Sequence, residues 1–284
     1  MPKRAGMEDA VLTEAVLESS RDLDRRSVAE ILGAIHAEDR AAFEAVGRVL
    51  PAAVEAVEIL TLVLAGGGRW FNVGAGTSGR MGVVDAAEIP PTFGYPPDRV
   101  QAILAGGLDA LARAVEGAED RGDEARRELR ARGLVPGDAV LAISASGRTP
   151  FALAALDEAR AVGARRIALC CDPGSPLAER AELVIAPVVG PEVIAGSTRM
   201  KGGLAQKMVL HLLSTAVMVK LGRVEGNLMT HMLPASRKLR RRAVLLVASL
   251  AGLPEPEAER LLDLHRGSIQ DAVQSARRPA RSEP

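Results

Sequence analysis

The sequence predicts an α/β fold, a three-layer αβα sandwich with a central parallel sheet of about five strands. Short uninterrupted apolar runs alternate with helical stretches downstream of Gly66, and such runs suit strands that are buried on both faces of a sheet. Helical segments between consecutive strands indicate that the strands are parallel. The expected strands are residues 70–73, 100–104, 139–143, 167–171 and 183–189.

The region before this sheet is expected to be a helical segment over residues 8–65. Its apolar residues recur at helical spacing, as in Val28, Ile31, Leu32 and Ile35. The sheet domain itself is expected over residues 66–225, and no internal repeat on the scale of a solenoid unit is visible.

The last part of the sheet domain should be a long helix over residues 202–220, closed by Gly222 as a left-handed cap. A small helical C-terminal domain is expected at residues 235–276, with Gly267 separating its last two helices, 255–264 and 268–276. Residues 277–284 have nothing to bury and should be disordered.

Composition excludes several classes of protein. Of 284 residues, 48% are apolar and 25% are charged, which is typical of a globular protein. The 36 basic residues balance the 36 acidic ones, so no long-range field favours nucleic acid or an anionic membrane, and a bound anion must be held locally. One Trp, one Tyr and four Phe are too few for a base-stacking surface. We therefore expect a small-molecule partner, with neither nucleic acid nor membrane.

The protein is expected to be cytoplasmic. The longest apolar stretches, such as 243–253, are shorter than the roughly 20 residues that span a bilayer. The first residues lead directly into Glu8 and Asp9 without the hydrophobic region of a secretory signal. The two cysteines, Cys170 and Cys171, are adjacent within an expected strand, so we interpret them as packing residues on opposite sheet faces.

The loop after the first expected strand, Gly74 to Arg80, satisfies the G-x-G-x-x-G pattern of dinucleotide sites. Dinucleotide binding also needs an acid at the end of the second strand to hold the ribose. Here that strand ends in Leu104-Ala-Gly-Gly, and Asp98 lies before it instead. We therefore expect no nucleotide cofactor.

A second hydroxyl-rich loop, Ser144 to Pro150, follows the third expected strand, and its Ala-Ser-Gly-Arg repeats the Thr-Ser-Gly-Arg of the first. Both loops should lie at the carboxyl edge of the sheet and lead into helices. Hydroxyl groups, backbone N–H groups exposed by glycine and a helix N-terminus suit a phosphate monoester. The alternative is that Ser and Thr only cap the two helices.

The two loops resemble those of the sugar isomerase (SIS) phosphosugar-binding domain. More narrowly, five segments resemble the N-acetylmuramic acid 6-phosphate etherase family, in family order, and the similarity extends from about Leu12 to Lys238. The glucokinase regulatory protein shares much of this pattern. The segments are GAGTSGRMGVVDAAEIPPTFG (74–94), AVEGAED (114–120), ISASGRTP (143–150), EVIAGSTRMK (192–201) and GNLM (226–229).

Three residues depart from the family pattern. Ile89 stands where a Cys is usual, Leu204 where a Thr is common, and His231 where an acid is common. Because Ile89 can neither donate nor accept a proton, a required cysteine at this position is excluded here. The part after Leu239 is shorter and less similar.

The resemblance implies removal of D-lactate from C3 of the ring-opened sugar phosphate, which needs neither metal nor cofactor. The C1 aldehyde acidifies the C2 hydrogen, so a base removes it while an acid protonates the departing lactate oxygen, and water then adds at C3. The family's two catalytic glutamates correspond to Glu88, the proton donor to lactate, and Glu119, the candidate base.

Both glutamates also have structural interpretations. Glu119 lies at helical spacing from Glu116 and so belongs, in the alternative, to a solvated helix face. Glu88 precedes Ile89-Pro90-Pro91, where the helix should end, and is expected to be partly buried and thereby suited to a general acid. A helix from Gly79 places Glu88 about 13 Å from the phosphate loop, so it is expected to serve the other subunit of a homodimer.

Arg199 and Lys201 are candidates for contact with the lactate carboxylate or the enolate, with edge solvation as the alternative. The four histidines share no ligand spacing, so no metal site is expected. The full set of expected substrate-binding residues is Gly76, Thr77, Ser78, Gly79, Arg80, Glu116, Ser144, Ser146, Gly147, Arg148, Thr149, Ser197, Thr198, Arg199 and Lys201.

Three functions remain open at this point. The first is a phosphosugar lyase, favoured by the second acid, Glu88. The second is an aldose–ketose isomerase on the same fold, which also begins by removing the C2 proton. The third is a sugar-phosphate sensor without chemistry, which should tolerate loss of either glutamate.

Overall fold

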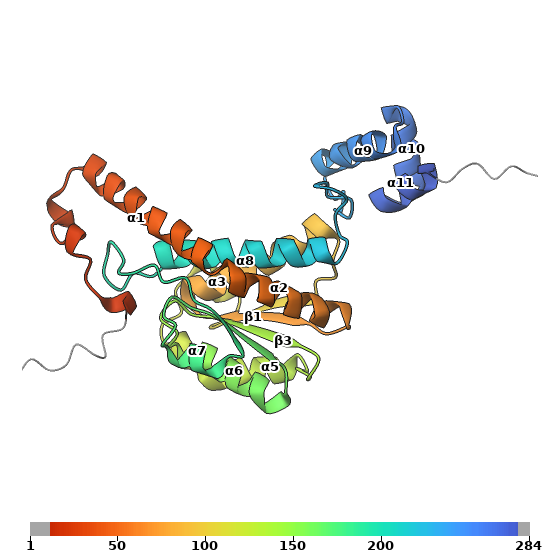
Figure 1. The fold of residues 1–284 in the computed structure, drawn as a ribbon. Coiled ribbons are helices and arrows are strands. Elements are labelled where there is room, and N and C mark those ends of the chain that lie inside the picture. Colours follow the sequence, from red (N-terminus) through yellow and green to blue (C-terminus); the bar gives the residue numbers. More distant parts are fainter. Residues whose placement is uncertain (1–11, 278–284) are drawn as a thin grey trace, which may run out of the picture. The chain divides into compact units, whose positions relative to one another are not determined.

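The computed structural model describes residues 12–277, which form two compact units (Figure 1). The sheet unit contains residues 12–86 and 98–215, and the helical unit contains residues 87–97 and 216–277. Helices α3 (Gly76–Phe93) and α8 (Lys201–Lys220) both begin in the sheet unit and end in the helical unit. Each predicted domain is one continuous stretch of sequence, with boundaries at residues 65, 225 and 235. These boundaries stay a prediction.

The sheet has five parallel strands in the order β2-β1-β3-β4-β5, which confirms the predicted fold class. Four predicted strands are close to the observed ones, while the strand expected at 183–189 is only three residues long. The strands are β1 (Trp70–Gly74), β2 (Val100–Leu104), β3 (Ala139–Ile143), β4 (Arg165–Leu169) and β5 (Leu183–Ile185).

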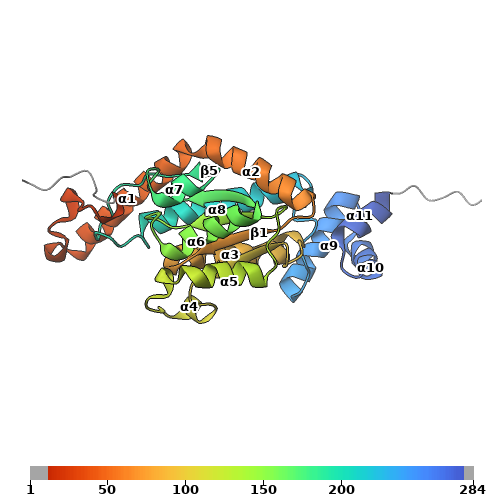
Figure 2. The ribbon, with the colours of Figure 1, turned by 90° about the horizontal axis from the view of Figure 1, so that it is seen from below.

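Helices cover both faces of this sheet (Figures 1 and 2). Phe71 and Val73 of β1 face the core formed with α5 (Gly122–Ala131), α6 (Pro150–Val162) and α7 (Pro176–Arg180). On the opposite face, the Asn72 side-chain amide donates to the carbonyl oxygen of Gly82 in α3 at 3.3 Å. Burial on both faces explains why the strands have uninterrupted apolar sequences.

The helical segment before the sheet is confirmed within the described residues, while residues 8–11 of that prediction lie outside them. A capping box starts α1, because the Ser27 hydroxyl accepts from the Glu30 N–H and the Glu30 carboxylate accepts from the Ser27 N–H. The elements are 3₁₀ turns η1 (Leu12–Glu14), η2 (Glu18–Ser20) and η3 (Leu23–Arg25), and helices α1 (Val28–Arg48) and α2 (Leu50–Ala65).

The helical unit contains α9 (Arg237–Ala251), α10 (Glu255–Leu264) and α11 (Ile269–Arg277). Their apolar faces form a core of their own, and Gly267, at φ +87°, makes the turn between the last two helices as expected. Arg277 was predicted to lie in the disordered tail, but it is the last residue of α11. The rest of that predicted tail lies outside the described residues.

The prediction that α3 ends before its two prolines is wrong. The helix continues through Pro90 and Pro91 to Phe93, and Gly94, at φ +57°, donates to the Pro90 carbonyl where the helix stops. A proline removes one backbone hydrogen bond and disfavours a helical conformation in the residue before it, without forbidding it. Near a helix end this cost is tolerated, so the glycine terminates the helix.

Helix α8 is long and apolar enough to cross a membrane by length and composition alone, but 56% of its most apolar window is buried in the fold. That burial is typical of the central helix of a globular domain. Gly222, at φ +73°, follows its end as predicted.

The two cysteines follow β4 instead of lying in it, and both are buried and free. Burial raises the pKa of the Cys171 thiol to about 12, so this thiol is not a nucleophile near neutral pH. Within residues 12–277, no three His, Cys, Asp or Glu side chains are grouped as metal ligands.

Candidate active site

The segment predicted as the first loop, residues 74–80, is almost entirely regular structure. Gly74 ends β1 and Gly76 begins α3, so only Ala75 lies between them. Because α3 begins at Gly76, the predicted phosphate-binding residues Thr77 and Ser78 lie in its first turn, where backbone N–H groups lack intrahelical partners. Gly76 has a φ of +52°, which favours glycine. This first turn is therefore an electropositive helix end suited to an anion.

The second loop, residues 144–149, starts at the same level of the sheet, because Gly74 and Ile143 are partners in the β1–β3 register. The Ser144 and Thr149 hydroxyls are 2.9 Å apart, and the Gly147 N–H donates to the Ser144 hydroxyl at 3.1 Å. The strand order reverses between β1 and β3, which is where parallel α/β sheets bind ligands.

For Thr149 of the second loop, the alternative that the side chain only caps the following helix is wrong. Thr149 precedes α6, yet its side chain makes no capping hydrogen bond to that helix. The Ser146 hydroxyl accepts from the Arg148 N–H at 3.3 Å, so it shapes the loop and does not cap the helix.

The third loop, residues 190–200, leads into α8, and the first turn of that helix adjoins the other two loops. A methyl group added to Gly203 would lie 3.1 Å from the Thr77 methyl group, and one added to Gly202 would lie 3.6 Å from Cβ of Ala145. The structure thus brings Thr77 of the first loop and Ala145 of the second loop next to the start of α8.

The acidic segment, residues 113–120, borders a cavity of about 160 Å³ beside the first loop. This cavity brings both predicted acids of the segment, Glu116 and Glu119, next to Gly76 and Arg80. Its lining residues are Ala75, Gly76, Arg80, Ala105, Ala110, Ala114, Val115, Glu116, Gly117, Ala118 and Glu119.

The interpretation of Glu119 as part of a regular helix face is wrong. Helix α4 (Asp109–Ala112) ends before the segment, and Gly117 takes a φ of +68°. Glu119 then lies in the 3₁₀ turn η4 (Ala118–Asp120). Because Gly117 turns the chain between them, Glu116 and Glu119 do not share a helix.

Arg80, expected to contact substrate, is already hydrogen bonded within the fold. Its guanidinium donates to the carbonyl oxygens of Ala110 at 2.8 Å and Arg113 at 3.1 Å. Arg80 therefore ties α3 to the acidic segment and holds one wall of the cavity.

Glu88 lies in the part of α3 that belongs to the helical unit and is not among the cavity's lining residues. The expectation that it is partly buried is wrong, since its side chain is exposed and its neighbour Ile89 is buried instead. Alternation of faces along a helix that continues past Pro90 accounts for the difference.

The predicted residues of the third loop have different environments. Ser197 and Thr198 are half-buried and Arg199 is exposed, whereas Lys201 is buried and forms an ion pair with Glu38 of α1. No sequence pattern indicated a role for Glu38 or for Glu192, whose carboxylate accepts from the N–H groups of Lys201 and Gly202 at 3.1 and 2.9 Å. Leu204 and His231, the other two residues that depart from the family pattern, do not line the cavity beside the first loop.

Comparison with known proteins identifies the class of protein to which this fold belongs. Residues 53–160 match the glucokinase regulatory protein N-terminal SIS domain family, and residues 128–216 match the SIS domain family. Among solved structures, phosphoheptose isomerases of Francisella tularensis and Neisseria gonorrhoeae have the same fold. Their TM-scores are 0.50 and 0.51, their identities 22% and 19%, and the alignments cover 68% and 67% of this chain and 98% of each of theirs. These features define a protein of the SIS-domain class.

Closer relatives distinguish among members of that class. N-acetylmuramic acid 6-phosphate etherases of Symbiobacterium thermophilum and Jannaschia sp. are 49% and 46% identical, over 93% of this chain and 87% and 84% of theirs. The etherase of Pectobacterium atrosepticum is 44% identical, over 93% of this chain and 87% of its own. The chain belongs to the N-acetylmuramic acid 6-phosphate etherase family. The predicted family and enzyme class are thereby confirmed.

Proposed function

We propose that this chain removes the D-lactyl ether of N-acetylmuramic acid 6-phosphate, giving N-acetylglucosamine 6-phosphate and D-lactate, in the cytoplasm during amino sugar recycling. The family supports the etherase activity. The observation that carries the assignment of residues is the cavity that joins the first loop to Glu116 and Glu119. It supplies an anion-binding helix end and a carboxylate base within one small volume.

The phosphate binds at the first turn of α3 and the hydroxyl-rich second loop. Thr77, Ser78 and Ser146 contribute hydroxyl groups, and the exposed N–H groups of the α3 first turn donate to the phosphate oxygens. Gly147, at φ +65°, takes a backbone conformation that favours glycine and so shapes the second loop. This anchor fixes the sugar so that its C2 faces the acidic segment.

The reaction then uses two carboxyl groups in sequence. Glu119 accepts the C2 proton, the electrons form an enolate and then the C2–C3 double bond, and the C3–O bond breaks. Glu88 donates a proton to the departing lactate oxygen. Water adds its hydroxyl group at C3 and a proton returns to C2, so the sum is hydrolysis of the ether. An acid and a base are both required because an ether oxygen leaves poorly without protonation.

We also propose that the enzyme is a homodimer in which Glu88 serves the site of the second copy. The cavity of about 160 Å³ is smaller than the several hundred Å³ of ordinary ligand sites, and Glu88 does not line it. Large apolar side chains of α1 and α2 are also exposed, with Phe43 at 69%. The others are Val28, Leu32, Leu50, Val54 and Leu62. Val28 and Leu32, like Leu50 and Val54, are four positions apart and so share a helix face, and a contiguous apolar patch is typical of an interface.

Purified protein should release D-lactate from N-acetylmuramic acid 6-phosphate without added metal or nucleotide. The proposed chemistry needs only proton transfer and an anion site, so a chelator should leave the rate unchanged. An enzymatic lactate assay measures the rate, and unphosphorylated N-acetylmuramic acid is the control for the phosphate anchor. Absence of lactate, or a rate that falls in chelator and returns with metal, would contradict the proposal.

The Glu88→Gln variant should lose lactate release but still exchange the C2 hydrogen with solvent, because only the proton donor is removed. Mixed in equal amounts with an inactive Ser78→Ala/Ser146→Ala protein, it should recover about a quarter of wild-type activity. Random re-pairing makes about half the dimers mixed, and each mixed dimer contains one intact site. If mixed dimers are detected by mass and stay inactive, Glu88 and the phosphate loops serve the same chain.

A further inference from the structure

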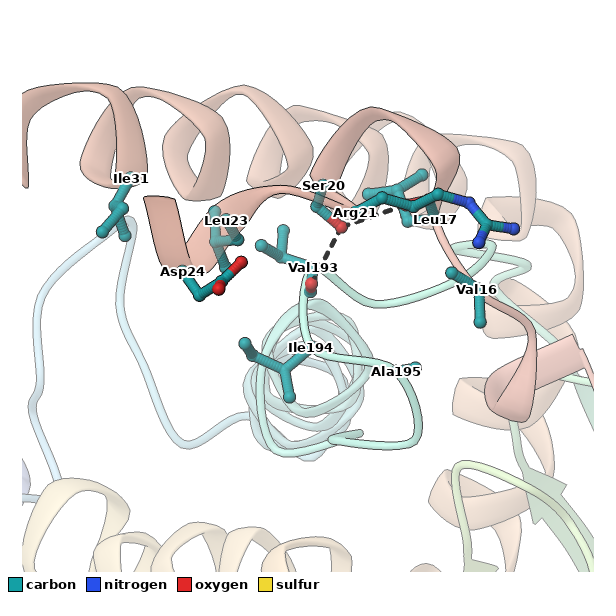
Figure 3. A pocket seen from close by; sticks show the side chains of 10 residues that line it. All are labelled: Val16, Leu17, Ser20, Arg21, Leu23, Asp24, Ile31, Val193, Ile194 and Ala195. Carbon is teal, nitrogen blue, oxygen red and sulfur yellow. Dashed lines mark hydrogen bonds between the residues drawn. The ribbon is translucent and has the colours of Figure 1, made fainter. Parts of the chain in front are cut away.

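The segment of residues 12–48, here called the N-terminal arm, contacts the third loop and its flanks at several points. The Ser20 hydroxyl donates to the Val193 carbonyl at 2.9 Å (Figure 3). The Glu14 carboxylate lies against Gly196, where an added methyl group would approach Oε2 to 2.8 Å. Residues far apart in sequence therefore hold this loop from one side.

The most buried of these contacts is the ion pair between Glu38 of α1 and Lys201, which are 163 positions apart. The Lys201 side chain is only 3% exposed and that of Glu38 is 27% exposed. An ammonium group buried to this degree requires a compensating charge. Lys201 is also the first residue of α8, so the ion pair holds the start of that helix.

Glu192 does not replace Glu38 in this role. Both of its oxygens accept backbone N–H groups, from Lys201 and Gly202, at the start of α8. Burial raises the pKa of Glu192, while these N–H groups and the positive charge of Lys201 oppose that rise. Glu192 thus caps the helix end, and Glu38 is the carboxylate bonded to the Lys201 ammonium.

Within the part of the chain that the structure describes, apolar packing covers the third loop only in part. An open cavity of about 740 Å³ lies between the loop residues Val193 to Ala195 and the arm residues Val16, Leu17, Leu23 and Ile31 (Figure 3). Ile194, at the centre of the loop, is 52% exposed. Among residues 12–277, nothing fills this space, so the loop depends on its polar contacts to the arm.

We propose that Glu38 is a positioning residue for the etherase reaction. By holding Lys201, it keeps the third loop and the first turn of α8 against Thr77 of the first loop and Ala145 of the second. The kinetic consequence rests on the proposed function, because those two loops are where we propose the phosphate binds. The structural consequence, a third loop that loosens without Glu38, does not depend on the substrate.

The test compares Glu38→Gln with Glu44→Gln. Glu44 lies on the same helix, is 57% exposed and pairs with Arg40 at the surface, so it controls for the loss of one charge from α1. Glu38→Gln should raise KM for the sugar phosphate about tenfold and change kcat less than about twofold, because binding and not proton transfer is weakened. Glu38→Asp, which keeps the charge on a shorter side chain, should give an intermediate KM, and Glu44→Gln should match wild type.

Hydrogen exchange of backbone amides supplies a readout that needs no substrate. Residues 193–200 should exchange several-fold faster in Glu38→Gln, while residues 144–149 should be unchanged. If Glu38→Gln does not fold, Glu38→Asp decides the question, and intermediate KM and exchange support the proposal. Wild-type KM and wild-type loop exchange in the Glu38 variants would overturn it. A wild-type protein that releases no lactate would refute the proposed function, whereas the exchange result would still decide the role of Glu38.

Discussion

The Glu119→Gln variant should lose both lactate release and exchange of the C2 hydrogen with solvent, each by a factor of about 10² to 10⁴. Glutamine keeps the shape of the side chain but cannot accept the C2 proton at neutral pH. Since proton removal precedes cleavage of the C3–O bond, no later group restores the rate. Exchange in deuterium oxide, followed by mass spectrometry, and a lactate assay measure the two steps separately.

The neighbouring residue provides a matched control for that experiment. Asp120 lies in the same 3₁₀ turn and is exposed, but it does not line the cavity. The Asp120→Asn variant should therefore exchange the C2 hydrogen and release lactate at wild-type rates. Retention of C2 exchange in Glu119→Gln would assign the base to another group, and Glu116, on the same cavity wall, would be the next candidate.

The sheet was predictable because its signal is local. For β3, the predicted and observed residues are identical, since a strand buried on both faces is a continuous apolar run with clear ends. For β4, the prediction was two residues too far along the chain. The strand begins with Arg165 and Arg166, which reach solvent at its amino-terminal end, and the apolar run continues into the Cys pair after the strand ends.

The parts of the site that the sequence did not predict depend on contacts between distant residues. Nothing near Lys201 in sequence shows that Glu38 is its partner. The family resemblance singles out Lys201, and lysine is scarce in this chain, but neither signal identifies the residue that pairs with it. Likewise, Arg80 matches a phosphate-loop motif, but its guanidinium donates to carbonyls about 30 residues away. A motif specifies which side chain is present, whereas its partners depend on which segments the fold places beside it.

The Gly79→Ala variant should be destabilised by about 3 kcal/mol or more, at or above the upper end of the cost of overpacking, and should lose activity as the first loop shifts. The added Cβ would lie 2.4 Å from the Gly74 carbonyl oxygen and 2.6 Å from Cδ1 of Leu104. The carbonyl belongs to β1, so relief requires α3 to move away from the strand.

Gly33→Ala is the matched control, because Gly33 lies inside α1 and, its own helix backbone aside, no atom of the described residues lies within 4 Å of an added Cβ. It should gain about 0.5–1 kcal/mol from the better helix propensity of alanine. Urea unfolding of both variants measures the difference, and a Gly79→Ala protein as stable as wild type would contradict the close approach of α3 to β1. The same contact explains why this loop matches a dinucleotide motif. The last glycine of that motif allows a helix to pack closely on a strand, and this requirement is independent of the ligand bound at the turn.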